Sequence, residues 1–198
     1  MAVLTDARAR GFLGKGPVEA HIAHARAFLR HWRPAPSSAS LDLGSGGGVP
    51  GLVLANDRPA SRWVLLDASG AKAAFLSMAC AALGMGDRVT VVTARAETAG
   101  RDGAHRGRYA WVVARAFAGP AVVAECAAPL LGVGGVLLVS EPPEPGVRWP
   151  APGLEQLGMV AGEPDGVAPR IAVLHQRHPC PDRFPRRVGI PAKRPLWT

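Results

Sequence analysis

A glycine-rich turn between two apolar runs constrains this chain more than any other segment, and it reads LDLGSGGGVPG over residues 41–51. The apolar start predicts a buried strand, and the apolar residues 52–55 predict a helix. Pro50 would stand at the first helical position, where the N–H that proline lacks has no partner anyway. Glycines let a ligand approach the backbone, and a helix N-terminus offers unpaired N–H groups and a positive dipole end. The turn therefore predicts a site for a nucleotide-like ligand.

The glycine spacing leaves the class of nucleotide open. Counted from Gly44, the dinucleotide fingerprint G-x-G-x-x-G fails, because position 49 is valine. A shifted frame, from Gly46 through Gly48 to Gly51, does fit it. Asp42, just before the first glycine, is the second difference from the dinucleotide pattern. A purely structural glycine turn is the remaining alternative.

A second carboxylate supports a ribose-containing ligand. Asp67 ends the apolar run 63–66, about 20 residues beyond the turn, where an acid bonds a ribose hydroxyl in nucleotide-binding folds. Enzymes that use NAD share this feature, so Asp67 alone does not choose between cofactors. Strand, turn, helix, strand and acid agree with one another, which favours a ligand site over a structural turn.

Apolar runs and helical periodicity alternate along the rest of the chain. The predicted strands after the turn are 62–67, 88–93, 109–113 and 136–139, with a late strand at 170–176. The predicted helices are 17–32, 49–56, 71–83, 120–131 and a short one at 154–159. We expect segment 88–93 to be buried, because it is β-branched and continuous, and Phe75, Met78, Ala79 and Leu83 to face the core. The alternation predicts an α/β fold, a doubly wound parallel sheet with helices on both faces, in one domain over residues 1–198.

Ligands of such folds bind at the carboxyl ends of the strands. The polar residues at or near these predicted ends are Asp42, Asp67, Arg95, Glu97, Arg115, Ser140 and Glu141. His21 and His24 lie on nearby faces of the helix 17–32, but no carboxylate or cysteine cluster accompanies them, so we expect no metal site. The segment 34–38 is predicted to be a linker.

Charge and cysteine content indicate the kind of partner and the cellular location to expect. The net charge of +8 and the pI near 10.6 favour a polyanionic partner, although an arginine-rich composition is the simpler alternative. No apolar run is long enough to span a membrane, residues 1–10 lack the apolar region of a signal peptide, and the three cysteines are widely spaced. These features predict a cytoplasmic protein with free thiols.

The end of the chain forms a distinct basic segment. Residues 182–198 carry Arg183, Arg186, Arg187, Lys193 and Arg194 against one acid, Asp182. Prolines at 185, 191 and 195 oppose helix formation. We therefore expect an extended basic arm that either lies on the domain or contacts phosphates.

Several stretches together resemble one family, the bacterial small-subunit (16S) rRNA guanine-N7 methyltransferases known as RsmG or GidB. They are LDLGSGGGVPGLVL (41–54), LLDASGAKAAFL (65–76), RAE (95–97), VARA (113–116), PLL (129–131) with the following glycine pair, and FPRRVGIPAKRPL (184–196). The resemblance implies a class I methyltransferase fold with a C-terminal antiparallel hairpin, and S-adenosylmethionine (SAM) as cofactor. It also implies RNA as partner.

The resemblance also implies roles for particular residues. It places SAM against Gly44, Ser45, Gly46 and Gly48, its ribose on Asp67 beside Ala68, and its adenine at the backbone of Ala96 beside Glu97. Asp42 would anchor the turn or approach the methionine amino group. Arg115 and Arg95 match family arginines in the cleft. Salt bridges at strand ends are the alternative for both arginines.

The reaction class limits the catalytic groups that are needed. Guanine N7 has a lone pair and no proton to lose, so its methylation needs positioning and exclusion of water, with no general base. Arg115, Arg95 and Glu141 are the catalytic candidates. Glu141 or His175 would serve as base for a protonated acceptor, and a solvated loop residue is the simpler interpretation of Glu141.

Differences from the family keep other functions open. The segment 140–143 reads SEPP where the family usually has Lys-Gly, and Ala71-Lys72 replaces a lysine-arginine pair. The family also usually carries a longer N-terminal helical region. A methyltransferase redirected to a small-molecule acceptor, a non-catalytic SAM- or RNA-binding module, and an NAD-linked oxidoreductase remain as alternatives.

Overall fold

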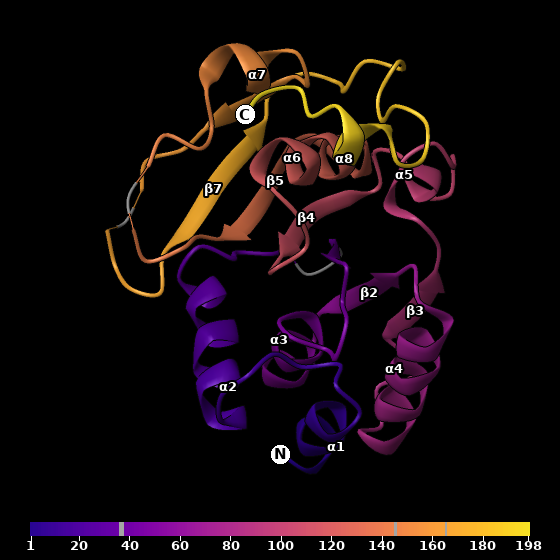
Figure 1. Ribbon diagram of the computed structural model, residues 1–198. Helices are drawn as coiled ribbons and strands as arrows, with labels where there is room; N and C mark the ends of the chain where they lie inside the picture. Colours follow the sequence, from indigo (N-terminus) through magenta and orange to yellow (C-terminus); the bar gives the residue numbers. More distant parts are fainter. Residues whose placement is uncertain (36–37, 145, 165) are drawn as a thin grey trace.

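A seven-stranded sheet runs through the computed structural model, which describes residues 1–35, 38–144, 146–164 and 166–198 (Figure 1). The strands are β1 (Ala39–Leu43), β2 (Arg62–Asp67), β3 (Val89–Thr93), β4 (Tyr109–Ala114), β5 (Leu131–Ser140), β6 (Met159–Ala161) and β7 (Ile171–Gln176). Their order is β3-β2-β1-β4-β5-β7-β6. The first five strands pair in parallel, whereas β7 is antiparallel to both β5 and β6. This confirms the predicted doubly wound α/β fold and its antiparallel end.

Helices cover both faces of the sheet (Figure 1). One face carries α1 (Ala2–Ala9), α2 (Val18–Ala27) with η1 (Phe28–Arg30), α3 (Gly51–Asp57) and α4 (Gly70–Ala82). The other carries α5 (Ala96–Ala99), α6 (Pro120–Ala127) with η2 (Ala128–Leu130), α7 (Ala151–Glu155) and α8 (Ile190–Lys193). Among the described helices, none is both long and apolar enough to cross a membrane.

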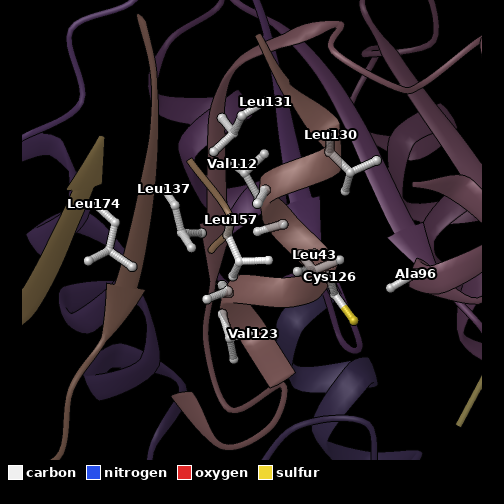
Figure 2. Packing of buried hydrophobic residues seen from close by; sticks show 14 of the residues in the cluster. Leu43, Ala96, Val112, Val123, Cys126, Leu130, Leu131, Leu137, Leu157 and Leu174 are labelled. Carbon is white, nitrogen blue, oxygen red and sulfur yellow. The ribbon is translucent and has the colours of Figure 1, made fainter. Parts of the chain in front are cut away.

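Neighbouring strand positions contribute to opposite layers of the core, as the alternation of side chains along a strand requires. Leu66 and Val112 pack in the cluster around α6, part of which Figure 2 shows. Leu65 and Val113, one position away, pack in the cluster against α3 and α4. Both faces of the central strands are therefore buried, which fixes the strand ends rigidly at the edge where polar residues gather.

Two predictions of burial are wrong. Strand β3 forms as expected, but it lies at the edge of the sheet, and only Val89 in it is buried. Met78 is 54% exposed, because the buried face of α4 is centred on Leu76, Ala79 and Cys80, and Met78 lies outside it. Leu83 is 40% exposed, since it caps the helix beyond its last turn.

Other boundaries also differ from the sequence predictions. The helix α1 was not predicted, and the short late helix is α7, several residues earlier than expected, so that Met159 starts a strand. Pro50 is the N-cap of α3, one position before the helix. The arm 182–198 contains α8, because Pro191 occupies its first turn, where proline is tolerated. The predicted linker 34–38 lies partly outside the described residues.

Candidate functional site

The order of the strands reverses between β1 and β4. After each of these two strands the chain leaves the sheet at the strand's carboxyl end. The glycine turn leaves β1, and its first two N–H groups, of Gly44 and Ser45, donate to the carbonyl of Leu66 at 2.9 and 3.0 Å. Gly44, Gly46 and Gly48 have φ values of +74, +53 and +93°, which favour glycine. The turn is thus fixed beside β2 at the point where doubly wound sheets bind ligands.

A cavity of about 370 Å³ opens at this point. It is lined by residues at the ends of four strands, by residues of helices α4, α5 and α6, and by Ala192 of the C-terminal arm. Of the predicted cofactor residues, Gly44, Asp67, Ala68, Ala96 and Glu97 line it together with Arg95, whereas Asp42, Ser45, Gly46, Gly48 and Arg115 do not. A larger apolar cavity of about 680 Å³ lies between α1, α2 and α3, away from the strand ends and their polar residues.

The first glycine of the turn is required by a neighbour that the sequence did not identify. A Cβ on Gly44 would lie 2.5 Å from a ring carbon of Phe117. Phe117 follows β4 and lines the cavity beside the glycine turn. The residue between it and Arg115, Ala116, has a φ of +53°, an uncommon conformation for a residue other than glycine. Phe117 is therefore held close to the floor of the cavity.

Asp42 anchors the turn from beneath. It is fully buried, and its Oδ2 accepts a hydrogen bond from the N–H of Gly51 at 2.9 Å. No described residue bonds its Oδ1. Burial raises the pKa of this carboxyl to about 7, against the hydrogen bonds that favour its charged form. The buried Ser45 hydroxyl donates to the Asp42 carbonyl at 3.0 Å, so both residues shape the turn from within.

Asp67 connects the turn to the cavity. Its Oδ2 accepts from the N–H of Gly46 and its Oδ1 from the N–H of Ser69, both at 2.8 Å. Each carboxylate oxygen has a second lone pair, so these bonds leave acceptor capacity for a hydroxyl group of a ligand. The carboxylate is therefore fixed in place and still able to hold a ribose.

The opposite wall joins α5 to the C-terminal arm. Oε1 of Glu97 accepts from Nη2 of Arg95 at 3.3 Å and from the N–H of Gly189 at 2.9 Å, and Ala192 lines the cavity. Burial alone would raise the pKa of Glu97, but these hydrogen bonds and the charge of Arg95 hold it below its usual value. Arg95 thus forms the salt bridge that was the alternative interpretation of this residue, and its partner Glu97 lines the cavity.

A second cavity, of about 290 Å³, adjoins the first and shares residues 116–118 with it. Arg115, Ser140 and Glu141 line it. Oε1 of Glu141 accepts from Nη1 of Arg148 at 3.3 Å and from the indole N–H of Trp149 at 3.2 Å, and the side chain is only 7% exposed. The interpretation of Glu141 as a solvated loop residue is therefore wrong.

Helix α2 contacts two residues that line this second cavity, Arg115 and Ser140. Nη2 of Arg115 donates to Nδ1 of His21 at 2.8 Å, and Nε2 of His21 lies 3.1 Å from the carbonyl of Gly14. A guanidinium only donates and a carbonyl only accepts, so His21 carries its proton on Nε2 and is neutral in this arrangement. Within the described residues Arg115 forms no ion pair, and its side chain is aligned by His21 instead.

His24 and His175 lie in different surroundings. Nε2 of His24 lies 2.9 Å from the Ser140 hydroxyl, and burial, followed by the charge of Arg115, lowers its pKa. His175 lies on β7 and lines neither cavity. In the described part of the chain no three His, Cys, Asp or Glu residues gather closely enough to hold a metal ion.

Comparisons with known proteins give the site a context. The family model described as "rRNA small subunit methyltransferase G" (GidB) matches residues 18–141. Ribosomal RNA small subunit methyltransferase G of Roseiflexus sp. (strain RS-1) is 40% identical over 190 residues, which cover 92% of this chain and 80% of that protein. Its counterpart from Rubrobacter xylanophilus is 41% identical over 170 residues, covering 78% of this chain and 64% of that protein.

A solved structure supports the fold. The antibiotic-resistance methyltransferase Kmr superposes with a TM-score of 0.60 at 16% sequence identity, over 81% of this chain and 91% of that chain. At 16% sequence identity this similarity shows that the two proteins share a fold, namely the arrangement of the sheet and helices.

Proposed function

The chain belongs to the rRNA small subunit methyltransferase G (GidB) family of SAM-dependent methyltransferases, and from this premise we propose that it methylates N7 of a guanine in 16S rRNA. The observation that carries the proposal is the pair of adjoining cavities at the sheet reversal. The first offers a fixed carboxylate beside a glycine turn, and the second has polar and aromatic walls. One suits the cofactor and the other its acceptor.

The residues of the first cavity fit SAM. Asp67 presents acceptor capacity for the ribose hydroxyls, and the backbone at Ala96 and Glu97 lies along the same wall for the adenine. Gly44 also lines this cavity, and its lack of a side chain makes room for the ring of Phe117. We assign Gly46, Gly48, Ser45 and Asp42 to holding the turn in shape. When bound, SAM supplies an electrophilic methyl group on a sulfonium.

The reaction needs little acid–base chemistry from the protein. The N7 lone pair forms the new bond to the methyl carbon as the sulfur–methyl bond breaks, and no proton leaves the base. The contribution of the protein is to align donor and acceptor and to exclude water. Arg115, which lines the second cavity and is aligned by His21, is the residue that we assign to this positioning.

The basic surface supports an RNA acceptor. Within the arm, Arg186 is engaged with Glu125, whereas Arg183, Arg187 and Lys193 are exposed. With the net charge of +8, these side chains are available to phosphates, and binding would weaken steeply as salt rises. An rRNA substrate also agrees with a cytoplasmic location.

One observation favours a second candidate function. Glu141 places a carboxylate in the acceptor cavity where the family usually has a lysine. This exchange of charge would also suit a cationic or hydrogen-bond-donating small molecule. A SAM methyltransferase with such an acceptor is therefore the alternative.

Two measurements test the proposal. The first is calorimetric titration with SAM and with NAD; Asp67→Ala should weaken SAM binding by roughly 1–3 kcal/mol, the scale for leaving buried partners unpaired. The exposed Asp87, which has no hydrogen bond in the described structure, serves as matched control through Asp87→Ala. Equal SAM affinities for wild type and Asp67→Ala would contradict the ribose assignment.

The second measurement is transfer of a labelled methyl group to 16S rRNA from a strain that lacks the corresponding gene. We expect label at a single guanine. SAM binding without label in RNA would favour the small-molecule alternative, and absence of SAM binding would refute both candidates.

A further inference from the structure

We propose that the second cavity is a subsite for a single purine base, and that Glu141 recognises the Watson–Crick edge of guanine there. The inference rests on the proposed function, which supplies the cofactor in the neighbouring cavity. It concerns a segment in which this chain departs from its family, so it follows from the residues of this protein.

The carboxylate of Glu141 has one occupied and one available oxygen. Oε1 accepts from Arg148 and Trp149, whereas no described donor contacts Oε2, and Oε2 is not among the enclosed atoms that lack a partner. An ionised carboxylate only accepts hydrogen bonds. Glu141 lines the second cavity and also a neighbouring cavity of about 220 Å³. A ligand that reaches Oε2 from the second cavity must offer N–H or O–H donors at that point.

Guanine is the base that meets this requirement best. Its Watson–Crick edge carries two adjacent donors, N1–H and the N2 amino group, and the two lone pairs of Oε2 can accept from both. Adenine offers one donor there, the N6 amino group, and places the lone pair of N1 beside it, so it would pair less completely with Oε2 in this largely buried position. Enzymes that act on a nucleobase commonly read this edge by hydrogen bonds while aromatic side chains stack on the ring.

The walls of the cavity supply such surfaces and hold the carboxylate still. Phe117 and Trp149 both line it. The carbonyl of Arg148 accepts from the indole N–H of Trp197 at 3.1 Å, so the segment that carries the two partners of Glu141 is tied to the C-terminal arm. A pre-positioned carboxylate loses little freedom on binding, which strengthens its discrimination between bases.

The orientation agrees with transfer to N7. In guanine N7 lies on the Hoogsteen edge, a different edge from the one that carries N1–H and the N2 amino group. With the N1–N2 edge at Glu141, N7 is turned away from Glu141. Residues 116–118 line both this cavity and the cofactor cavity. The same contact that selects guanine would therefore leave N7 free to face the methyl donor.

Nucleotide binding tests the inference without any methyl transfer. Equilibrium dialysis with GMP and AMP, in the presence of S-adenosylhomocysteine, measures the preference of the wild type, which we expect to be about tenfold to a hundredfold for GMP. Glu141→Gln keeps the shape and the acceptor for Arg148 and Trp149, but turns an N–H donor toward the base. The GMP preference should then disappear or invert, because glutamine repels N1–H and can donate to N1 of adenine.

A matched control distinguishes recognition from a structural effect. Glu144 is exposed in the same segment, and Glu144→Gln should keep the wild-type preference. A structural role for Glu141 would lower both affinities and leave their ratio unchanged. An unchanged ratio, or equal binding of GMP and AMP by the wild type, would overturn the inference.

Substrate analogues separate this inference from the proposed function. In an RNA fragment that carries the mapped guanine, 7-deazaguanosine at that position should abolish methylation, because it lacks N7. Inosine, which lacks only the N2 amino group, should reduce kcat/KM about tenfold in the wild type and less than threefold in Glu141→Gln. Methylation of the 7-deaza fragment would refute transfer to N7 while the dialysis result stands; equal inosine effects in both proteins would refute the role of Glu141.

Discussion

The contact between Glu125 and Arg186 should hold the C-terminal arm on the domain, and its removal offers a quantitative test. The Glu125 carboxylate lies on α6 and is fully buried. It accepts three hydrogen bonds from Arg186: from the backbone N–H at 2.9 Å, from Nε at 2.8 Å and from Nη2 at 2.6 Å. Nη2 also donates to the carbonyl of Arg194 at 2.7 Å, so one guanidinium organises both halves of the arm.

Arg186→Ala removes two of the three donors and leaves a buried carboxylate with one backbone N–H. Loss of one partner of a buried ion pair costs about 3–5 kcal/mol. The side chain of Arg186 is 27% exposed, so water can replace part of its contribution and the lower end applies. We expect a loss of about 3 kcal/mol in the free energy of unfolding, which for a chain of this length lowers Tm by about 6–12 °C.

Urea denaturation followed by circular dichroism measures this loss, and limited trypsin digestion reports release of the arm. Arg187→Ala is the matched control, because Arg187 is exposed and its side chain forms no hydrogen bond in the described structure; it should change stability by less than about 0.5 kcal/mol. Replacing both Glu125 and Arg186 by methionine should recover most of the loss. A cost for Arg186→Ala no larger than that of the control would refute the reasoning.

Two further perturbations probe the glycine turn. Gly51→Ala would bring its Cβ to 2.5 Å from Asp42 Oδ2 and 2.7 Å from Leu65 Cδ2, so it should destabilise the fold by about 1–3 kcal/mol in urea denaturation, whereas Gly86→Ala, in open space, should not. The raised pKa of Asp42, about 7 in the folded protein against a usual 3.8, means that the folded state binds the proton more tightly. This proton binding stabilises the folded state fully at pH values below 3.8, the usual pKa of the carboxyl. The stabilisation, at most about 4 kcal/mol, is lost as the pH rises through 7. Asp42→Asn should flatten this part of the curve of stability against pH, and parallel curves would contradict the assignment.

Local sequence patterns were sufficient to predict the parallel sheet and the part of the site formed by the glycine turn and Asp67. The turn after β1 and the acid after β2 depend on short-range chemistry, namely glycine conformation, helix starts and the position of strand ends, so Gly44 and Asp67 could be placed from the sequence. The same signals could not show that β3 is an edge strand, because its position depends on the order of strands that are distant in sequence. Helix α1 is short and mixed in composition, and only two of its residues, Leu4 and Ala7, are buried against the rest of the protein. Its sequence therefore shows no clear helical pattern of apolar residues.

The contacts that the sequence could not predict join residues far apart in the chain. His21 and Arg115 carry no shared motif, and only the return of α2 to the sheet edge brings them within 2.8 Å. From the sequence, Glu141 was interpreted as a solvated loop residue that precedes two prolines. In the structure Arg148 and Trp149 fold back and donate hydrogen bonds to it. An aromatic residue just after the end of a central strand, as in Phe117, was the one local signal that could have extended the predicted site.

The wall formed by Gly189 and Ala192 has a consequence for synthesis of the protein. A nascent chain that has completed all seven strands still lacks this wall, so its cofactor site becomes complete only after translation has passed residue 192. A premature stop codon between β7 and Gly189 would leave every strand in the translated chain and yet deprive Glu97 of one of its donors.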